Sequence, residues 1–398
     1  MPSSRPPKSD PVPREGSDSG GHGSDDLTGL RTAAAEFGRG LNDGLATRDR
    51  EGRFPAEEWR ACAAFGIQAL AVPAALGGAG APLGTVIAVM GGLGLGCEDN
   101  GLLFSLNAQM WSVQHPLVKF GSDDQRSRYL PGLMAGELIG AHGMTEPESG
   151  SDAFSLTTRA VKDGAGYVLN GRKTFITNAP VAGVAVVFAT LDPELGVGGV
   201  TAFIVDLDTP GIEVDRTESK MGMRTSPMGD LVLNDCRLPG SARLGGEGGG
   251  AAIFNSSMEW ERGSILSGCT GAIERELTRA VAYAKTRRQF GEPIGRFPAV
   301  AERLAEMRVR LEASNGLLRR VADLIDGGRP AAMEAAIAKL YVSEAWVASS
   351  LEAQSVYGAW GYTVDNGIER QVRDALASRI YSGTSDIQRL VIARRLGL

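Results

Sequence analysis

One acidic residue in the second half of the chain has the setting of a general base. Glu261 falls on an apolar stripe with Phe254, Met258 and Ile265, which recur at the spacing of one face of a helix. Burial removes water from a carboxylate and raises its pKa towards the range in which a base works near neutral pH. We therefore predict that Glu261 is a catalytic base. The alternative is a structural ion pair between Glu261 and Arg262 or another cation.

A second carboxylate competes for the same role. Glu259 lies two positions before Glu261 in the same predicted helix. At about 100° per residue, the two side chains point roughly 200° apart around the helix axis. The two side chains therefore cannot both face one cleft. The apolar stripe favours Glu261 as the carboxylate that faces it.

A polar loop in the first half of the chain is suited to an aromatic ligand. Residues 144–152 read Met-Thr-Glu-Pro-Glu-Ser-Gly-Ser-Asp, which combines hydroxyl groups with a glycine and backbone amides that can turn inward. Such a loop suits an aromatic cofactor ring that forms hydrogen bonds at its edge. A plain Ser/Gly/Pro turn explains the same composition, so the loop alone leaves both interpretations open.

The composition argues against several classes of protein. The chain has 398 residues, 43% of them hydrophobic, and a formal net charge of −6, which fits two or three globular domains. It has no run of five or more Lys and Arg, so nucleic acid is not an expected partner. No apolar stretch approaches the roughly 18 residues of a membrane span, and the first residues lack a signal-peptide core, which favours the cytoplasm. Four scattered cysteines and three histidines support neither a disulfide framework nor a metal site.

The spacing of apolar residues changes twice along the chain. Residues 1–26 are rich in Ser, Pro, Gly and Asp and are predicted to form a disordered tail. Residues 27–140 have helical spacing and predict an N-terminal α-helical domain. Residues 141–247 contain β-rich runs and predict a middle β-domain. Residues 248–398 return to long helical patterns, so we expect a C-terminal α-helical domain and an α+β fold.

The individual elements follow from the same periodicities. Asn170-Gly171 is a strong hairpin signal and predicts a turn between two strands of the middle domain. Strands are predicted at residues 167–169, 174–177, 184–190, 200–207 and 230–238. Helices of the C-terminal domain are predicted at residues 251–286, 298–326, 330–357 and 386–396. A pocket commonly forms where such modules meet, so we expect the functional site there.

Five segments resemble motifs of the acyl-CoA dehydrogenase family. Residues 145–152 match its T-E-P-x-x-G-S-D loop, and residues 173–178 match its K-x-(W/F)-I-T-N strand. Residues 287–291 match its R-x-x-F-G motif, and residues 354–361 and 383–388 match two further segments that contact FAD in the family. The resemblance implies an N-terminal helical domain, a β-barrel-like middle domain and a C-terminal four-helix bundle that together bind FAD.

The resemblance covers nearly all of the folded chain, about residues 55–396. It implies that Arg287 reaches the FAD pyrophosphate of a neighbouring subunit, a role that suits a planar guanidinium, and that the protein is a homotetramer. A solvated basic helix end is the alternative for Arg287. The cofactor-binding residues that the resemblance implies are Met144, Thr145, Gly150, Ser151, Phe175, Thr177, Arg287, Gln289, Phe290, Gln354, Gly358, Thr384 and Asp386.

One departure from the family pattern bears on the chemistry. Many members carry their catalytic Glu directly before the Gly-Thr-Ser segment, where this chain has Ser382. An unassisted serine is a poor base near neutral pH. Some members of the family instead carry the base on the first C-terminal helix, in an E-R or E-K pair that Glu261-Arg262 matches. The departure and the resemblance therefore both favour Glu261 as the base.

Three short segments of the sequence indicate one branch of this family. Residues 253–263, 379–384 and 393–398 look most like the branch of the family that oxidises prolyl groups tethered to peptidyl carrier proteins. That branch also has serine in place of the usual Glu. The substrate-binding residues that follow from the resemblance are Ser151, Arg262 and Ser382.

The resemblance implies an FAD-dependent dehydrogenase that oxidises the α and β carbons of an acyl thioester. Glu261 would remove the α-proton while the β-hydrogen leaves as hydride to the flavin. The acyl group is expected to be a prolyl or other small group on a carrier protein, with an electron-transfer flavoprotein or oxygen as the acceptor. Three alternatives stay open: a dehydrogenase for a short or branched acyl-CoA, a flavin monooxygenase on the same fold, and a non-catalytic thioester-binding protein.

Overall fold

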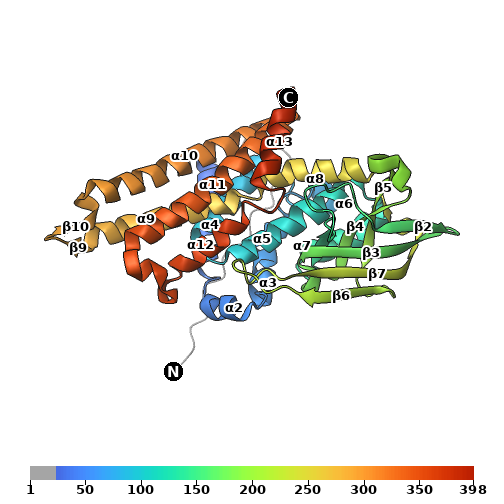
Figure 1. Ribbon diagram of the computed structural model, residues 1–398, viewed down its shortest axis with the longest axis horizontal. Coiled ribbons are helices and arrows are strands. Elements are labelled where there is room, and N and C mark those ends of the chain that lie inside the picture. Colours follow the sequence, from blue (N-terminus) through green and yellow to red (C-terminus); the bar gives the residue numbers. More distant parts are fainter. Residues whose placement is uncertain (1–23) are drawn as a thin grey trace.

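The computed structural model describes residues 24–398. A bundle of long helices forms one end of the molecule and a β-sheet forms the other (Figure 1). Residues 1–23 of the expected tail lie outside the described residues. The expectation of a tail through residue 26 is wrong for its last three residues, because helix α1 (Ser24–Arg39) begins at Ser24.

The N-terminal helices lie against both the sheet and the bundle. They are α1, α2 (Leu45–Glu51), α3 (Ala56–Phe65), α4 (Leu83–Gly96), α5 (Asn100–Gln109), α6 (His115–Phe120) and α7 (Asp123–Met134). A π-helical turn, η3 (Met110–Gln114), joins α5 to α6. Helix α4 lies close to the bundle helices because it is rich in glycine, and a Cβ at Gly94 would collide with the Gly268 carbonyl.

The middle of the chain forms one eight-stranded sheet. Its strands are β1 (Gly140–Gly143), β2 (Arg159–Asp163), β3 (Gly166–Thr177), β4 (Val184–Thr190), β5 (Val200–Asp206), β6 (Ile212–Thr217), β7 (Met228–Pro239) and β8 (Arg243–Leu244). The order is β6-β7-β3-β2-β4-β5-β8, and β1 pairs with β4 in parallel. Both faces of β4 are buried. Val184, Val186 and Phe188 pack towards the helices, whereas Ala185 and Val187 belong to the core enclosed by the sheet.

The predicted hairpin at Asn170-Gly171 is wrong. Strand β3 runs through both residues, and the turn before it lies at Gly164 and Ala165, between β2 and β3. Asn170 instead lies beside a register shift in the β3–β7 pairing, where its side chain exchanges hydrogen bonds with Asp235 at 2.8 and 3.1 Å. Pairing of β3 with strands on both sides outweighs the local turn preference.

The C-terminal helices are α8 (Gly250–Ser264), α9 (Ser267–Thr286), α10 (Pro298–Asp326), α11 (Ala332–Tyr357), α12 (Ile368–Ala377) and α13 (Ser385–Arg395). A two-stranded hairpin, β9 (Arg288–Gln289) and β10 (Glu292–Pro293), follows α9. None of these or the other described helices is long and apolar enough to span a bilayer.

The prediction of one helix over residues 251–286 is wrong. The helix breaks between α8 and α9 at Ile265 and Leu266. Hydroxyls on both sides of the break bond to nearby carbonyls, from Ser264 to Trp260 at 2.7 Å and from Ser267 to Ser264 at 2.6 Å. Such bonds compete with the helical ladder and bend helices. Helix α12 was not predicted from the sequence.

Candidate active site

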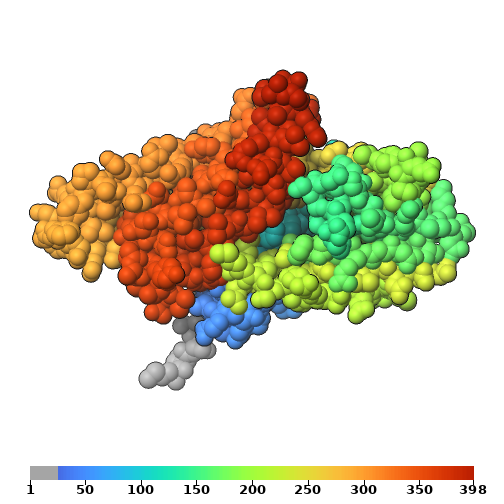
Figure 2. Space-filling model, in the orientation of Figure 1, coloured from blue at the N-terminus to red at the C-terminus, as the bar shows by residue number. Residues whose placement is uncertain are grey.

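A cavity of about 610 Å³ lies where the helices meet the sheet. Helix α5, the π-turn η3 and helix α8 form one side, and strands β1 and β3 form the other. The segment between α12 and α13 lines it as well. Figure 2 shows a recess between the C-terminal helices, in red, and the sheet, in green. Most of the exposed cavity wall is apolar, so a bound ligand would be held largely away from water.

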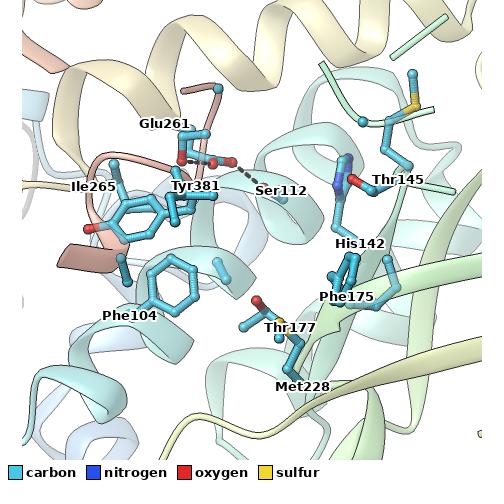
Figure 3. Close-up of a pocket in the computed structure, with 18 of the residues that line it drawn as sticks. Phe104, Ser112, His142, Thr145, Phe175, Thr177, Met228, Glu261, Ile265 and Tyr381 are labelled. Carbon is cyan, nitrogen blue, oxygen red and sulfur yellow. Dashed lines mark hydrogen bonds between the residues drawn. The ribbon is translucent and has the colours of Figure 1, made fainter. Parts of the chain in front are cut away.

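Glu261 points into this cavity from α8 and is 6% exposed. The hydroxyls of Ser112 and Ser382 each donate a hydrogen bond to one of its two carboxylate oxygens (Figure 3). Burial raises the pKa of Glu261, and the two hydrogen bonds oppose that rise because they stabilise the ionised form. Arg262 donates through Nε to the Ser382 carbonyl at 3.1 Å, not to the Glu261 carboxylate.

Glu259 lies on a different face of α8. Its carboxylate accepts a hydrogen bond from the Ala331 backbone amide at 2.6 Å, just before α11. It does not line the cavity. The predicted separation of the two carboxylates is confirmed, and Glu261 is the one that faces the cavity.

The segment that carries Ser382 is held from three directions. Lys339 of α11 is fully buried and donates to the Gly383 carbonyl at 2.7 Å. Gln388 of α13 and Arg262 of α8 both donate to the Ser382 carbonyl at 3.1 Å. Ser382 and Gly383 adopt positive φ angles of 56° and 88°. A serine in this strained conformation is typical of a functional segment, and here it directs the hydroxyl at Glu261.

The sheet side of the cavity carries the polar loop of residues 144–152. The predicted site residues of this loop that line the cavity are Met144, Thr145, Gly150 and Ser151. The loop is anchored by Glu146, which is 2% exposed and forms an ion pair with Lys173 of β3 at 2.7 Å.

Two residues of β3 lie beside this loop on the sheet side of the cavity, where the Thr174 amide donates to the Thr145 carbonyl at 2.9 Å. Phe175 and Thr177 both line it, and Phe175 keeps 56% of its surface exposed. Phe175 has a φ of 56° and lies at a register shift in the β3–β7 pairing, which turns its ring outward from the sheet. Asp230 of β7 holds this bend by accepting hydrogen bonds from the Thr174 hydroxyl at 2.7 Å and the Phe175 amide at 3.3 Å.

Six of the predicted cofactor-binding residues do not line the cavity of this chain. Their positions divide into three places. Arg287, Gln289 and Phe290 lie at the β9–β10 hairpin, at the end of the bundle remote from the sheet (Figure 1), and Phe290 is 95% exposed. Gln354 and Gly358 lie at the end of α11. Asp386 lies in the first turn of α13, and its side chain is exposed. By contrast, Arg262, Ser382 and Thr384 do line it.

Several lining residues were not predicted from the sequence, among them Phe104, Ser112, His142 and Tyr381. Ser112 has no sequence signal, because its direction depends on the π-turn and on a partner far along the chain. His142 has a buried Nε2 without a hydrogen-bond partner, and burial lowers its pKa to about 4, so the imidazole is neutral. Its position just before the polar loop could have drawn attention to it.

Comparison with protein families covers almost all of the described chain. The acyl-CoA dehydrogenase N-terminal domain matches residues 24–137. The middle domain of the same family matches residues 141–236, and its C-terminal domain matches residues 248–397.

Individual relatives agree with the family match. An L-prolyl-[peptidyl-carrier protein] dehydrogenase of Pseudomonas fluorescens is 42% identical over 347 residues, 87% of this chain and 91% of that protein. The crystal structure of the prolyl acyl carrier protein oxidase AnaB is 44% identical with a TM-score of 0.93, covering 95% of this chain and 100% of that chain. The structure of PigA with FAD and proline is 37% identical with a TM-score of 0.92, covering 95% and 99%. The chain therefore belongs to the acyl-CoA dehydrogenase family.

Proposed function

We propose that this protein is an FAD-dependent dehydrogenase that oxidises the α and β carbons of an acyl thioester, with Glu261 as the base that removes the α-proton. The observation that supports this proposal most directly is the setting of Glu261. It is a buried carboxylate with a raised pKa, directed into the cavity between the helices and the sheet. A carboxylate in that setting can take a proton from a carbon acid without water competing for it.

The residues on the sheet side of the cavity fit an isoalloxazine ring. Phe175 offers an exposed aromatic surface, and the hydroxyls of Thr145, Ser151 and Thr177 offer hydrogen bonds to the polar edge of such a ring. We assign Met144, Gly150 and Thr384 to the same binding site. When bound, FAD supplies the acceptor for the hydride that leaves the β-carbon.

The two serines explain how one glutamate can hold and release a proton. Both hydroxyls donate to the ionised carboxylate, one to each oxygen. After Glu261 takes the α-proton, its carboxyl group becomes a donor, and a serine hydroxyl can rotate to accept from it. Ser382 thus takes the place of the usual glutamate and becomes a partner of the relocated base. We assign Arg262, Ser382 and Ser151 to the neighbourhood of the thioester.

The substrate that we propose is a prolyl group on a carrier protein. The relatives at 42% and 44% identity are described as acting on prolyl groups of carrier proteins. The alternative is a short or branched acyl-CoA, which the family match also allows. We propose an electron-transfer flavoprotein or oxygen as the final acceptor.

A substrate panel tests this proposal. The FAD-loaded protein is mixed without oxygen with prolyl-carrier protein, butanoyl-carrier protein and butanoyl-CoA, and the flavin absorbance is followed. We expect rapid bleaching with prolyl-carrier protein. Bleaching by the CoA ester alone would favour the acyl-CoA alternative, and no bleaching by any thioester would contradict the proposed activity. Full activity of Glu261→Gln with oxygen would favour a monooxygenase.

The six residues outside the cavity support a proposal about assembly. Arg287, Gln289 and Phe290 lie too far along the bundle to serve the cavity of their own chain. We propose that they, with Gln354, Gly358 and Asp386, complete FAD sites across subunit contacts in a homotetramer. Light scattering and FAD absorbance after dilution test this. We expect FAD release to follow dissociation, and more readily in Arg287→Ala, whereas a stable monomer that keeps its FAD would refute it.

A further inference from the structure

The cavity ends in a wall of four side chains beyond Glu261, those of Phe104, Met223, Ile265 and Tyr381. Phe104 of α5 and Tyr381 of the segment before Ser382 lie with their ring centroids 4.4 Å apart and their planes tilted by 37°. Ile265, one helical turn after Glu261, lies beside them (Figure 3). The same figure shows Phe175 and His142 at the opposite end of the cavity. The wall therefore closes the end at which the base lies.

The wall separates the cavity from a small void. The side chains that line both the 610 Å³ cavity and a void of about 10 Å³ on the other side are Phe104, Met223, Ile265 and Tyr381. Leu103 and Trp346 line the void but not the cavity. A space of that size holds at most about one water molecule. An acyl chain cannot pass into it while the wall is intact.

The two aromatic residues differ in how firmly they are held. The Tyr381 side chain is half-buried and borders the void beside Cys269, and the Lys339 ammonium lies 5.9 Å from its ring centroid. Phe104 has no polar group, and its ring packs against Tyr381 on one side and borders the void. Phe104 is therefore the part of the wall whose removal would join the void to the cavity with the least disturbance of the base.

The distance from the base to the wall limits the acyl group. Glu261 must lie at the α-carbon, so the rest of the acyl group has to fit between Glu261 and the wall. Ile265 follows Glu261 by four residues, which is roughly 6 Å along the helix axis. This space suits a small ring or a short chain and excludes a long one. The apolar and aromatic surfaces also suit a compact group rich in C–H bonds.

We propose that Phe104 is a specificity-determining residue that restricts this enzyme to compact acyl groups, by closing the cavity directly beyond the base. The inference rests on the proposed function, because it concerns the acyl end of the same site. It assigns a substrate class, a ring or chain of few carbons, from the wall of this chain.

Chain-length profiles of Phe104 variants test the inference. Prolyl, butanoyl and octanoyl groups are loaded on one thioester carrier that the wild type accepts, and kcat/KM is measured for each. We expect the wild type to prefer the compact groups. In Phe104→Ala, the ratio of octanoyl to prolyl kcat/KM should rise at least about tenfold, since each methylene that gains room in an apolar pocket is worth about that factor. Phe104→Leu should give a smaller rise.

Leu103→Ala is the matched control. Leu103 precedes Phe104 on α5 and lines only the void, so its truncation enlarges the void and leaves the wall in place. We expect its profile to match the wild type. Flavin absorbance and circular dichroism confirm that each variant is folded and loaded.

The outcomes separate this inference from the proposed function. An unchanged octanoyl-to-prolyl ratio in folded Phe104→Ala and Phe104→Leu, including a failure of both to oxidise the octanoyl group, would overturn the inference alone. A wild-type enzyme that prefers the octanoyl group would also overturn the inference about Phe104. A wild type that oxidises no thioester at all would overturn the proposed function itself.

Discussion

Two buried glutamates, one on the sheet side of the site and one on the helix side, have opposite electrostatic settings. Glu146, on the sheet side, is 2% exposed, and Glu261, on the helix side, is 6% exposed. Burial alone would raise the pKa of Glu146, but Lys173 and donors from Thr157 and Thr158 lower it to about 2. Burial raises the pKa of Glu261, and its hydrogen bonds offset that rise only in part.

The difference lies in the partners and not in the burial. Glu146 accepts from the Lys173 ammonium at 2.7 Å and from the backbone amides of Thr157 and Thr158 at 2.5 and 3.0 Å, all of which can only donate. It also accepts from one hydroxyl, that of Thr157, at 2.7 Å. Glu261 has two hydroxyl partners, which can donate or accept. A carboxylate held by a buried cation and two backbone amides stays ionised and anchors a loop. A carboxylate between two hydroxyls can change its protonation state, as a base must.

Removing the base should give the largest effect on activity. We expect Glu261→Gln to lower kcat by about 10²–10⁴-fold, the usual contribution of a positioned general base, with the fold and bound flavin retained. Single-turnover flavin reduction measures this directly. Glu259→Gln, on the other face of α8, is the control and should reduce flavin at nearly the wild-type rate. Similar losses in both variants would show that the two faces of α8 do not differ in function.

Removing the anchor should instead affect stability. Glu146→Gln leaves Lys173 buried without its partner, so we expect a loss of about 3–5 kcal/mol in the free energy of unfolding. Because the pKa of Glu146 falls from 4.5 to about 2 on folding, its contribution is present above pH 4.5 and is lost as the pH falls towards 2. Denaturant titrations at several pH values measure the difference in free energy of unfolding between the wild type and Glu146→Gln. This difference should become smaller at acidic pH.

The exposed Glu148 in the same loop provides the control for the anchor. We expect Glu148→Gln to unfold like the wild type at every pH. If Glu146→Gln also matched the wild type near neutral pH, the ion pair between Glu146 and Lys173 would not stabilise the loop.

The smallest effects concern the two hydroxyls. Ser112→Ala or Ser382→Ala removes one donor to the ionised carboxylate, so the pKa of Glu261 should rise further in each variant. A higher pKa keeps the base protonated to higher pH, so the acidic limb of the kcat/KM profile should move upward. Ser257→Ala is the control, because its hydroxyl bonds only to the Ile253 carbonyl of the same helix at 3.1 Å. If the acidic limb of the kcat/KM profile were unchanged in both serine variants, the two hydroxyls would not set the pKa of Glu261.

The sequence predicted well where the physical cause is local. Helical periodicity alone placed Glu261 and Glu259 on different faces of one helix, and Pro298 and Asp326 are the ends of α10 as expected. The sequence erred where tertiary pairing outweighs a local preference. Asn170-Gly171 has the strongest turn signal of the middle domain, yet it lies inside β3 because strands on both sides of β3 pair with it.

By itself the sequence determined the family, the order of helical and β modules, and which carboxylate of the first C-terminal helix faces the cavity, because motifs and periodicities are properties of neighbouring residues. Only the tertiary structure decided which groups surround that carboxylate. Ser112 reaches Glu261 through a π-turn, and Phe104 meets Tyr381 from the other end of the chain. Such contacts depend on how separate elements pack, and no spacing along the chain encodes them.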